Sequence, residues 1–288
     1  MKIDAPLPPW WRDVFTFTFP VPQAVADKIA AAGDSGLRAV CAVLDPEFGD
    51  RPVPRPTADA RTFCAEILAR FARPELVPWL FELMDRDPED PIVPQLADPL
   101  AACGAPAVAI ACDRFARSEP GDALRPWLAD IAAHGGVRSD DVLAVLVTYL
   151  TVDPVHAGQL LIDYGDSSAV PALLLEFDAA PDDGEDFFPG TLPMLGSAIR
   201  ALGGELDAPR AARLAAVEEA SRQFEIAERR RLIEAEGFHQ YVERAEPGDA
   251  CPCESGETYG TCCAEIEAEL AERHRIRNPP AHRPRWLS

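Results

Sequence analysis

The sequence lacks any long hydrophobic run. Hydrophobic residues make up 48% of its 288 residues and charged residues 26%, but the unbroken apolar stretches are far too short to span a bilayer. Residues 1–6 contain no cationic segment that leads into an apolar stretch, as a secretory signal would. We therefore expect a globular, cytoplasmic protein that does not insert into a membrane.

The common sequence signatures of catalysis are also absent. No two-histidine motif such as H-E-x-x-H, no G-x-S-x-G turn and no phosphate-binding G-x-x-x-x-G-K-[ST] occurs. We therefore assign no catalytic residue and expect a non-enzymatic protein. A site assembled from distant helices leaves no such signature, so a hydrolase with carboxylates in a helical groove stands as the alternative. A deep pocket with converging Asp, Glu and His side chains would favour that alternative.

Lysine is scarce, and acidic side chains outnumber basic ones. The chain has 27 Lys and Arg against 48 Asp and Glu, a formal charge of −21. Residues 1–206 carry −17 of this charge, whereas the last sixteen residues hold five arginines and no acid. An acidic surface repels nucleic acid, so we expect a protein partner of unknown identity. Nucleic acid is an alternative partner for the arginine-rich tail alone, although a solvated tail that lies on the acidic body is the simpler interpretation.

Apolar residues recur with the helical period between residues 22 and 206, which indicates an all-α fold. The helix-like stretches are short and are separated by only a few residues. We expect helices over residues 22–32, 35–44, 58–72, 75–85, 92–102, 105–117, 121–133, 139–150, 154–164, 167–177 and 191–202. Aspartates at their starts would cap the first amides, and glycines would end several of them.

A Pro-x-Leu phrase recurs along this region. LVPWL at residues 76–80 returns as LRPWL at 124–128, and Pro-x-Leu also begins at positions 94, 171 and 193. Proline fits the first turn of a helix, so the leucine that follows should face a neighbouring helix. The stretch GDSSAVPALLLE at 165–176 resembles the opening of a HEAT repeat helix. The resemblance implies an α-solenoid of stacked, HEAT-like helix pairs.

Four of the eight cysteines are scattered among apolar, helix-like residues. A free cysteine behaves as a small hydrophobe. We therefore expect core packing for Cys41, Cys64, Cys103 and Cys112.

The other four cysteines lie within thirteen residues, spaced as C-x-C, eight residues and C-C. In a cytosolic protein such a cluster favours metal binding over disulfide bonds. Adjacent cysteines also rarely adopt the geometry of a disulfide. Four thiolates fill the tetrahedral shell of Zn²⁺, so we expect a structural zinc site without an open catalytic position. Its ligands would be Cys251, Cys253, Cys262 and Cys263.

The residues around these cysteines resemble the SEC-C motif, C-P-C-G-S-G-K-x-Y-K-x-C-[CH]. The resemblance covers about fifteen residues and implies that the four cysteines hold Zn²⁺, that Tyr259 packs against the knuckle and that Gly256 makes the turn. In the bacterial preprotein translocase motor, the lysine-rich surface of this motif contacts an export chaperone and the ribosome. Here Glu254 replaces the usual glycine of the motif, and Glu257, Thr258 and Gly260 stand where the motif is lysine-rich.

These features divide the chain into five parts. Residues 1–21 form an extended segment in which Phe15, Phe17 and Phe19 alternate with threonine. A HEAT-like domain over 22–206 follows, and Asp207 caps a linking helix within 207–246. The zinc knuckle occupies 247–273, with a helix expected over 264–273, and the basic tail occupies 274–288. We expect the whole to act as a zinc-binding interaction scaffold that docks to ribosomal or export components through the knuckle.

Overall fold

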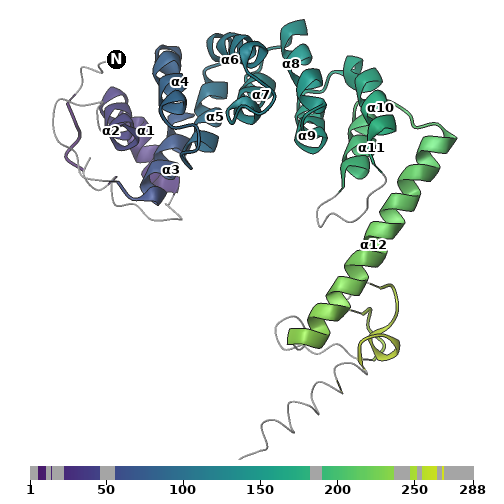
Figure 1. Cartoon of the computed structure of the whole chain (residues 1–288). Coiled ribbons are helices and arrows are strands. Elements are labelled where there is room, and N and C mark those ends of the chain that lie inside the picture. The colour runs from purple at the N-terminus through teal and green to yellow at the C-terminus, as the bar shows by residue number, and fades with distance from the viewer. Residues whose placement is uncertain are drawn as a thin grey trace, which may run out of the picture. The chain divides into compact units, whose positions relative to one another are not determined.

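The computed structural model describes residues 6–10, 14, 23–45, 56–181, 190–236, 247–251, 255–264 and 268, and this part of the chain is all-helical. An isolated antiparallel bridge between Ala250 and Thr258 is the one extended pairing within it. Phe15, Phe17, Phe19 and the tail over 274–288 lie outside the described residues. Figure 1 follows the helices, which are α1 (Gln23–Ala31), α2 (Asp34–Leu44), α3 (Ala58–Leu68), α4 (Val77–Arg86), α5 (Val93–Ala102), α6 (Ala105–Arg117), α7 (Arg125–His134), α8 (Asp140–Leu150), α9 (Pro154–Tyr164), α10 (Val170–Ala179), α11 (Thr191–Ala201) and α12 (Ala208–Glu236).

The helices expected between residues 22 and 206 are confirmed, with small changes at their ends, whereas most of the helix expected over 264–273 lies outside the described residues. The expected helix over 58–72 ends at Leu68, and the one over 121–133 begins at Arg125. The chain turns after α3, where Ala72 has a φ of 43°. Before α10, the residues Ser167–Ala169 form a short 3₁₀ turn, η4. Short turns of this type are common at helix starts because they satisfy the first free amides.

The recurring prolines lie in the first turns of their helices. Such prolines begin α4, α5, α7 and α10, where the missing N–H costs no helical hydrogen bond. Each leucine two positions after a proline of the repeated phrase is buried, with at most 2% of its surface exposed. These leucines are Leu80, Leu96, Leu128, Leu173 and Leu195. The repeat therefore marks the side chains that fill the core.

The helix ends show which capping expectations hold. Gly165 ends α9 in the left-handed conformation, with φ 71°, and its N–H donates to the Leu161 carbonyl. Asp207 caps α12, since its carboxylate accepts a hydrogen bond from the Arg210 amide. At the start of α8 the expectation of an aspartate cap is wrong, because the hydroxyl of Ser139 accepts the hydrogen bond from the Val142 amide. Asp140 lies within the first turn, where its negative charge is stabilised by the helix dipole.

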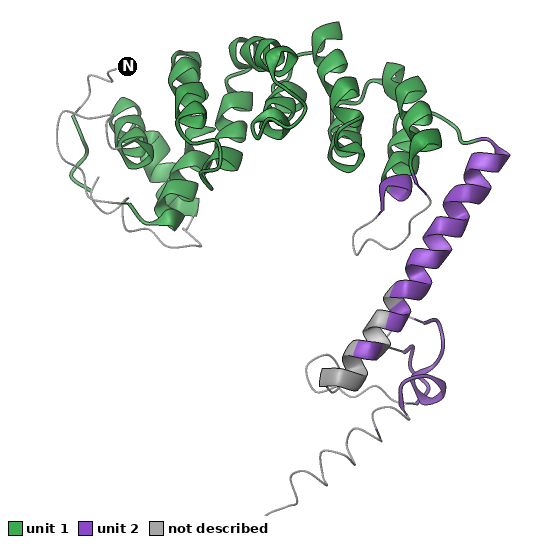
Figure 2. Ribbon diagram, viewed as in Figure 1, with its two compact units in different colours: residues 1–180, 194–206 green, residues 181–193, 207–288 purple. Residues whose placement is uncertain are grey.

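The chain forms two compact units (Figure 2). Unit 1 contains residues 1–180 and 194–206, and unit 2 contains residues 181–193 and 207–288. Within unit 1 the helices pack serially: α3 contacts α5, α5 contacts α7, and α7 contacts α9, while α6 contacts α8 and α8 contacts α10. The largest fully buried side chains lie in this unit and include Tyr149, Tyr164, Phe81 and Phe177.

A glycine allows close packing at the end of α7. A Cβ atom on Gly135 would lie 2.2 Å from Val108 Cγ2 of α6 and 2.9 Å from the Ile131 carbonyl oxygen. A side chain here would force neighbouring atoms to shift, so the glycine allows α6 and α7 to approach closely.

The long helix α12 belongs to unit 2 and is polar over most of its surface. Leu214 and Val217 of this helix are buried. Phe224 has 42% of its surface exposed. Among the helices that the structure describes, none combines the length and apolar character needed to cross a membrane.

Candidate metal centre

Backbone hydrogen bonds fold the cysteine-rich segment into a tight reversal. The Cys251 amide donates to the Glu257 carbonyl over 2.9 Å, and the Tyr259 amide donates to the Asp249 carbonyl over 2.8 Å. Gly256 lies in the turn with a φ of 82°, a conformation that glycine adopts without strain. This confirms the turn role that the motif resemblance implies for Gly256. The reversal brings the start of the segment alongside its end.

Three thiol groups converge within this reversal. The Sγ atoms of Cys251, Cys262 and Cys263 all lie within 4.8 Å of one another. Elsewhere in the described part of the chain, no other set of three His, Cys, Asp or Glu side chains comes this close. Cys253, the fourth expected ligand, lies outside the described residues. The structure therefore brings together the three expected ligands that it describes.

The sulfur spacing fits a tetrahedral metal site. Four sulfurs about 2.3 Å from one Zn²⁺ ion lie about 3.8 Å apart along each edge of the tetrahedron. The Sγ atoms of Cys262 and Cys263 are 3.8 Å apart. A disulfide would require about 2.05 Å. The two adjacent thiols are thus held at a distance suited to sharing one ion.

The surroundings of the thiols support this arrangement. Cys263 is fully buried and Cys251 has 4% of its surface exposed, and both pack with Tyr259 in one small cluster. This confirms the packing role that the motif resemblance implies for Tyr259. The Ser255 hydroxyl lies 3.2 Å from Cys262 Sγ, where it can donate a hydrogen bond to a thiolate. So small a cluster cannot fold by burial alone, so metal binding would supply its folding free energy.

The remaining cysteines are placed differently. Cys41 and Cys64 are fully buried, and burial raises the pKa of both thiols. Burial, followed by the charge of Glu75, raises the pKa of Cys103 to about 11. These three are core residues, as expected. Cys112 is an exception, because it is only partly buried and lines a cavity between α6 and α8.

Carboxylates and imidazoles gather elsewhere in unit 1, between α7 and α9. His156 Nε2 lies 3.4 Å from Asp130 Oδ1, and His134 Nε2 lies 3.3 Å from Asp163 Oδ2. None of these four side chains lines the cavity between α6 and α8. That cavity includes two carboxylates, Asp113 and Asp141, and no histidine among its described lining residues. The hydrolase alternative stays a prediction.

Comparison with known proteins gives one match. The family model of the SEC-C motif matches residues 249–265, which contain all four clustered cysteines. No curated protein and no solved structure matches the chain. The match agrees with the converging thiols and covers only this segment.

Proposed function

We propose that the protein is a zinc-bound, non-enzymatic scaffold that joins two polypeptides. The HEAT-like helical unit would hold one partner, and the zinc knuckle would dock a second. The observation that carries the proposal is the close grouping of Cys251, Cys262 and Cys263. All the ligand positions of such a site would be protein sulfurs, so the ion shapes a surface and leaves no position for a substrate.

The helical unit has features of a solenoid that offers binding surfaces. Its helices contact one another in serial order, and the Pro-x-Leu phrase places a buried leucine in each of five helices. We infer that it is an α-solenoid of HEAT-like pairs. In such folds each repeat packs on its neighbours, and extended surfaces are left for partners.

For the knuckle we propose a docking partner among ribosomal or export components, as the SEC-C resemblance implies. Glu257, Thr258 and Gly260 are exposed on this segment, where the motif usually carries lysines. Any contact made here would therefore use a surface without those cations. The arginine-rich tail immediately follows in the sequence and could supply positive charge instead.

Crosslinking in native lysate tests the scaffold. The full chain is compared with a variant that ends at residue 246 and with the full-chain variant Cys263→Ser. We expect a group of crosslinked partners that both altered proteins lose and a second group that both retain. Identical partner lists for all three proteins would rule out the docking role of the knuckle.

A further inference from the structure

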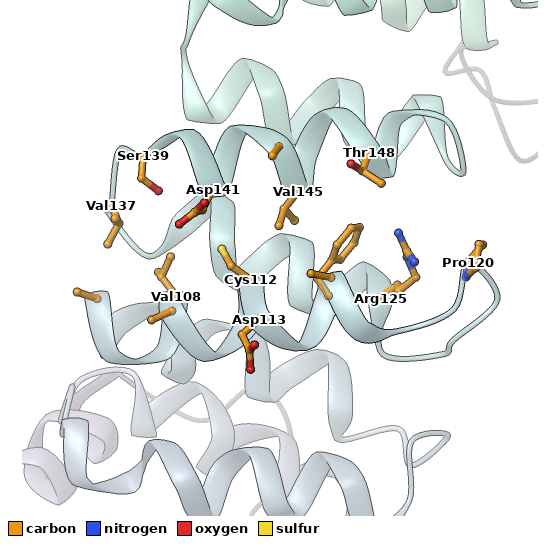
Figure 3. A pocket seen from close by; sticks show the side chains of 15 residues that line it. Val108, Cys112, Asp113, Pro120, Arg125, Val137, Ser139, Asp141, Val145 and Thr148 are labelled. Atoms are coloured by element: carbon orange, nitrogen blue, oxygen red, sulfur yellow. The ribbon is translucent and has the colours of Figure 1, made fainter.

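A cavity of about 910 Å³ lies between α6 and α8. Its walls are mainly apolar, with Val108 and Phe115 on α6, and Val145 on α8. Figure 3 shows the two helices side by side, with Val137 and Ser139 near Val108 at one end and Pro120 near Arg125 at the other. The cavity lies wholly within unit 1.

The cavity is an open groove and not a closed chamber. Ala105, Ala109 and Ala116 on α6 are exposed, as are Ala144 and Thr148 on α8. Small alanine side chains keep the space between the helices free. The lining from Ala105 to Ala116 corresponds to a length of about 16 Å at the helical rise of 1.5 Å per residue. An extended peptide of about five residues has this length.

An unusual cation lies at one end of the groove. Arg125 has only 5% of its surface exposed, although arginine is rarely buried without an acid beside it. Its guanidinium carbon lies 4.0 Å from the centre of the Phe115 ring, and Nη1 donates to the Ser118 carbonyl over 2.9 Å. Its Nε is buried and has no hydrogen-bond partner among the described residues. A buried guanidinium with an unsatisfied donor is stabilised by an anion placed beside it.

The acidic side chains of the groove are not partners of Arg125. The carboxylate of Asp113 forms an ion pair with Arg117, one turn further along α6. Asp141 is exposed near the opposite end of the groove, and the described residues form no ion pair with it. The groove therefore has a cation at one end and an anion toward the other, with apolar walls between them.

We propose that this groove binds a short, extended peptide of a partner protein, with an apolar centre and a carboxylate placed at Arg125. The inference rests on the proposed function, in which the helical unit holds a polypeptide. A carboxylate matches the single cation better than a phosphate, because Asp113 and Asp141 already make the surroundings negative. A basic residue of the peptide would face Asp141. The carboxylate comes either from an acidic side chain or from a chain end.

Fluorescence anisotropy with purified full-length protein tests the proposal. The probes are fluorescein-labelled hexapeptides that begin with Lys and have the centre Leu-Val-Leu-Val. One ends in alanine with a free carboxylate, one ends in amidated Asp, and one ends in amidated Asn. We expect at least one acidic probe to bind roughly tenfold or more tightly than the amidated Asn probe, since a charge-assisted bond is lost in the latter. The better acidic probe identifies the source of the carboxylate.

Two groove variants and one control complete the test. Arg125→Met removes the cation, and Ala144→Arg fills the groove from an exposed helix position. Both variants should bind the acidic probes about tenfold or more weakly than the unaltered protein does. Ala216→Arg places the same side chain on an exposed position of α12 and should leave binding unchanged. If Arg125→Met fails to fold, Ala144→Arg still decides the question.

Three results would overturn the groove assignment. The first is that no probe binds the unaltered protein at about 1 mM. The second is equal affinity for the acidic and the amidated Asn probes, and the third is unchanged affinity for the acidic probes in Ala144→Arg. Because this assay uses purified protein and defined peptides, its failure leaves the crosslinking result in lysate intact. Conversely, a lysate experiment without partners would leave a measured peptide affinity standing.

Discussion

His156 on α9 and Asp130 on α7 lie within ion-pair distance, with 3.4 Å between Nε2 and Oδ1. The other ring nitrogen, Nδ1, lies 3.2 Å from the Tyr149 hydroxyl. The hydrogen bond to Asp130 raises the pKa of His156, and burial opposes this shift less strongly. The imidazole thus joins three helices of unit 1 and carries its charge to higher pH than usual.

This pair predicts a pH-dependent stability. The pKa of His156 is higher in the folded than in the unfolded protein, where it lies near 6.5. Its contribution is complete below pH about 6.5 and is lost as the pH rises through the folded pKa. Urea unfolding of the unaltered protein and of His156→Gln should give free energies that differ more at pH 6 than at pH 9. Asp130→Asn should remove most of this pH dependence. If the loss of stability in His156→Gln is the same at pH 6 and pH 9, the assignment is contradicted.

A second ion pair joins α3 to the turn before α5. Arg61 Nη1 and Nη2 donate to the two carboxylate oxygens of Asp90 over 3.1 Å and 2.8 Å. We expect Arg61→Lys to lower the free energy of unfolding by about 1–2 kcal/mol, because a forked, partly buried pair is lost. Arg117→Lys is the matched control, since its pair with Asp113 is exposed and should contribute almost nothing. Equal losses in the two variants would refute this difference.

The same pair has a signature in acid. Burial pulls the pKa of Asp90 upward, but the hydrogen bonds from Arg61 and the Ile92 amide leave it lower than usual. Its contribution is present above the unfolded pKa of about 3.9 and is lost as the pH falls through the folded value. The cost of Arg61→Lys, measured by urea unfolding, should therefore shrink below pH 4. A cost that stays constant down to pH 2 would contradict the assignment.

Gly135 offers a packing test. An alanine Cβ would clash with Val108 Cγ2, so we expect Gly135→Ala to destabilise the protein by about 1–3 kcal/mol. Gly121→Ala is the control, because no atom lies within 4 Å of its Cβ position. Thermal and urea unfolding measure both. The double variant Gly135→Ala with Val108→Ala should lose less stability than the sum of the losses in the two single variants. Strictly additive losses would show that this contact is not the cause.

Metal removal should melt the knuckle. The amides of Cys251, Tyr259 and Gly260 are hydrogen-bonded within the reversal, and they should exchange slowly with deuterium when zinc is bound. A zinc chelator should make all three exchange fast, because little apolar burial remains to hold the fold. Slow exchange that survives complete chelation would show that the reversal folds without metal.

Much of the helical framework could be predicted from the sequence, because its signals are local. Proline followed by leucine fixes both a helix start and a core position, and Leu80 and Leu128 are buried as that pattern requires. The cysteine spacing likewise identified Cys262 and Cys263 as neighbours at one site. In each case the geometry depends on residues a few positions apart.

Other features depend on contacts between distant residues and were missed. The burial of Arg125 follows from its stacking on Phe115 of the preceding helix, whereas a single arginine in a sequence is normally expected on the surface. Cys112 was expected in the core, but the space between α6 and α8 leaves it partly exposed. The cap at Ser139 was missed because three polar residues in a row, through Asp141, are all suitable as caps.

Zinc content of purified full-length protein, prepared under reducing conditions and measured by mass spectrometry of the metal, tests the central claim most directly. We predict one zinc per chain, loss of that zinc in Cys263→Ser, and full retention in Cys112→Ser, whose thiol lies in the other unit. A substoichiometric metal content in the unaltered protein, or full zinc retention in Cys263→Ser, would contradict the account.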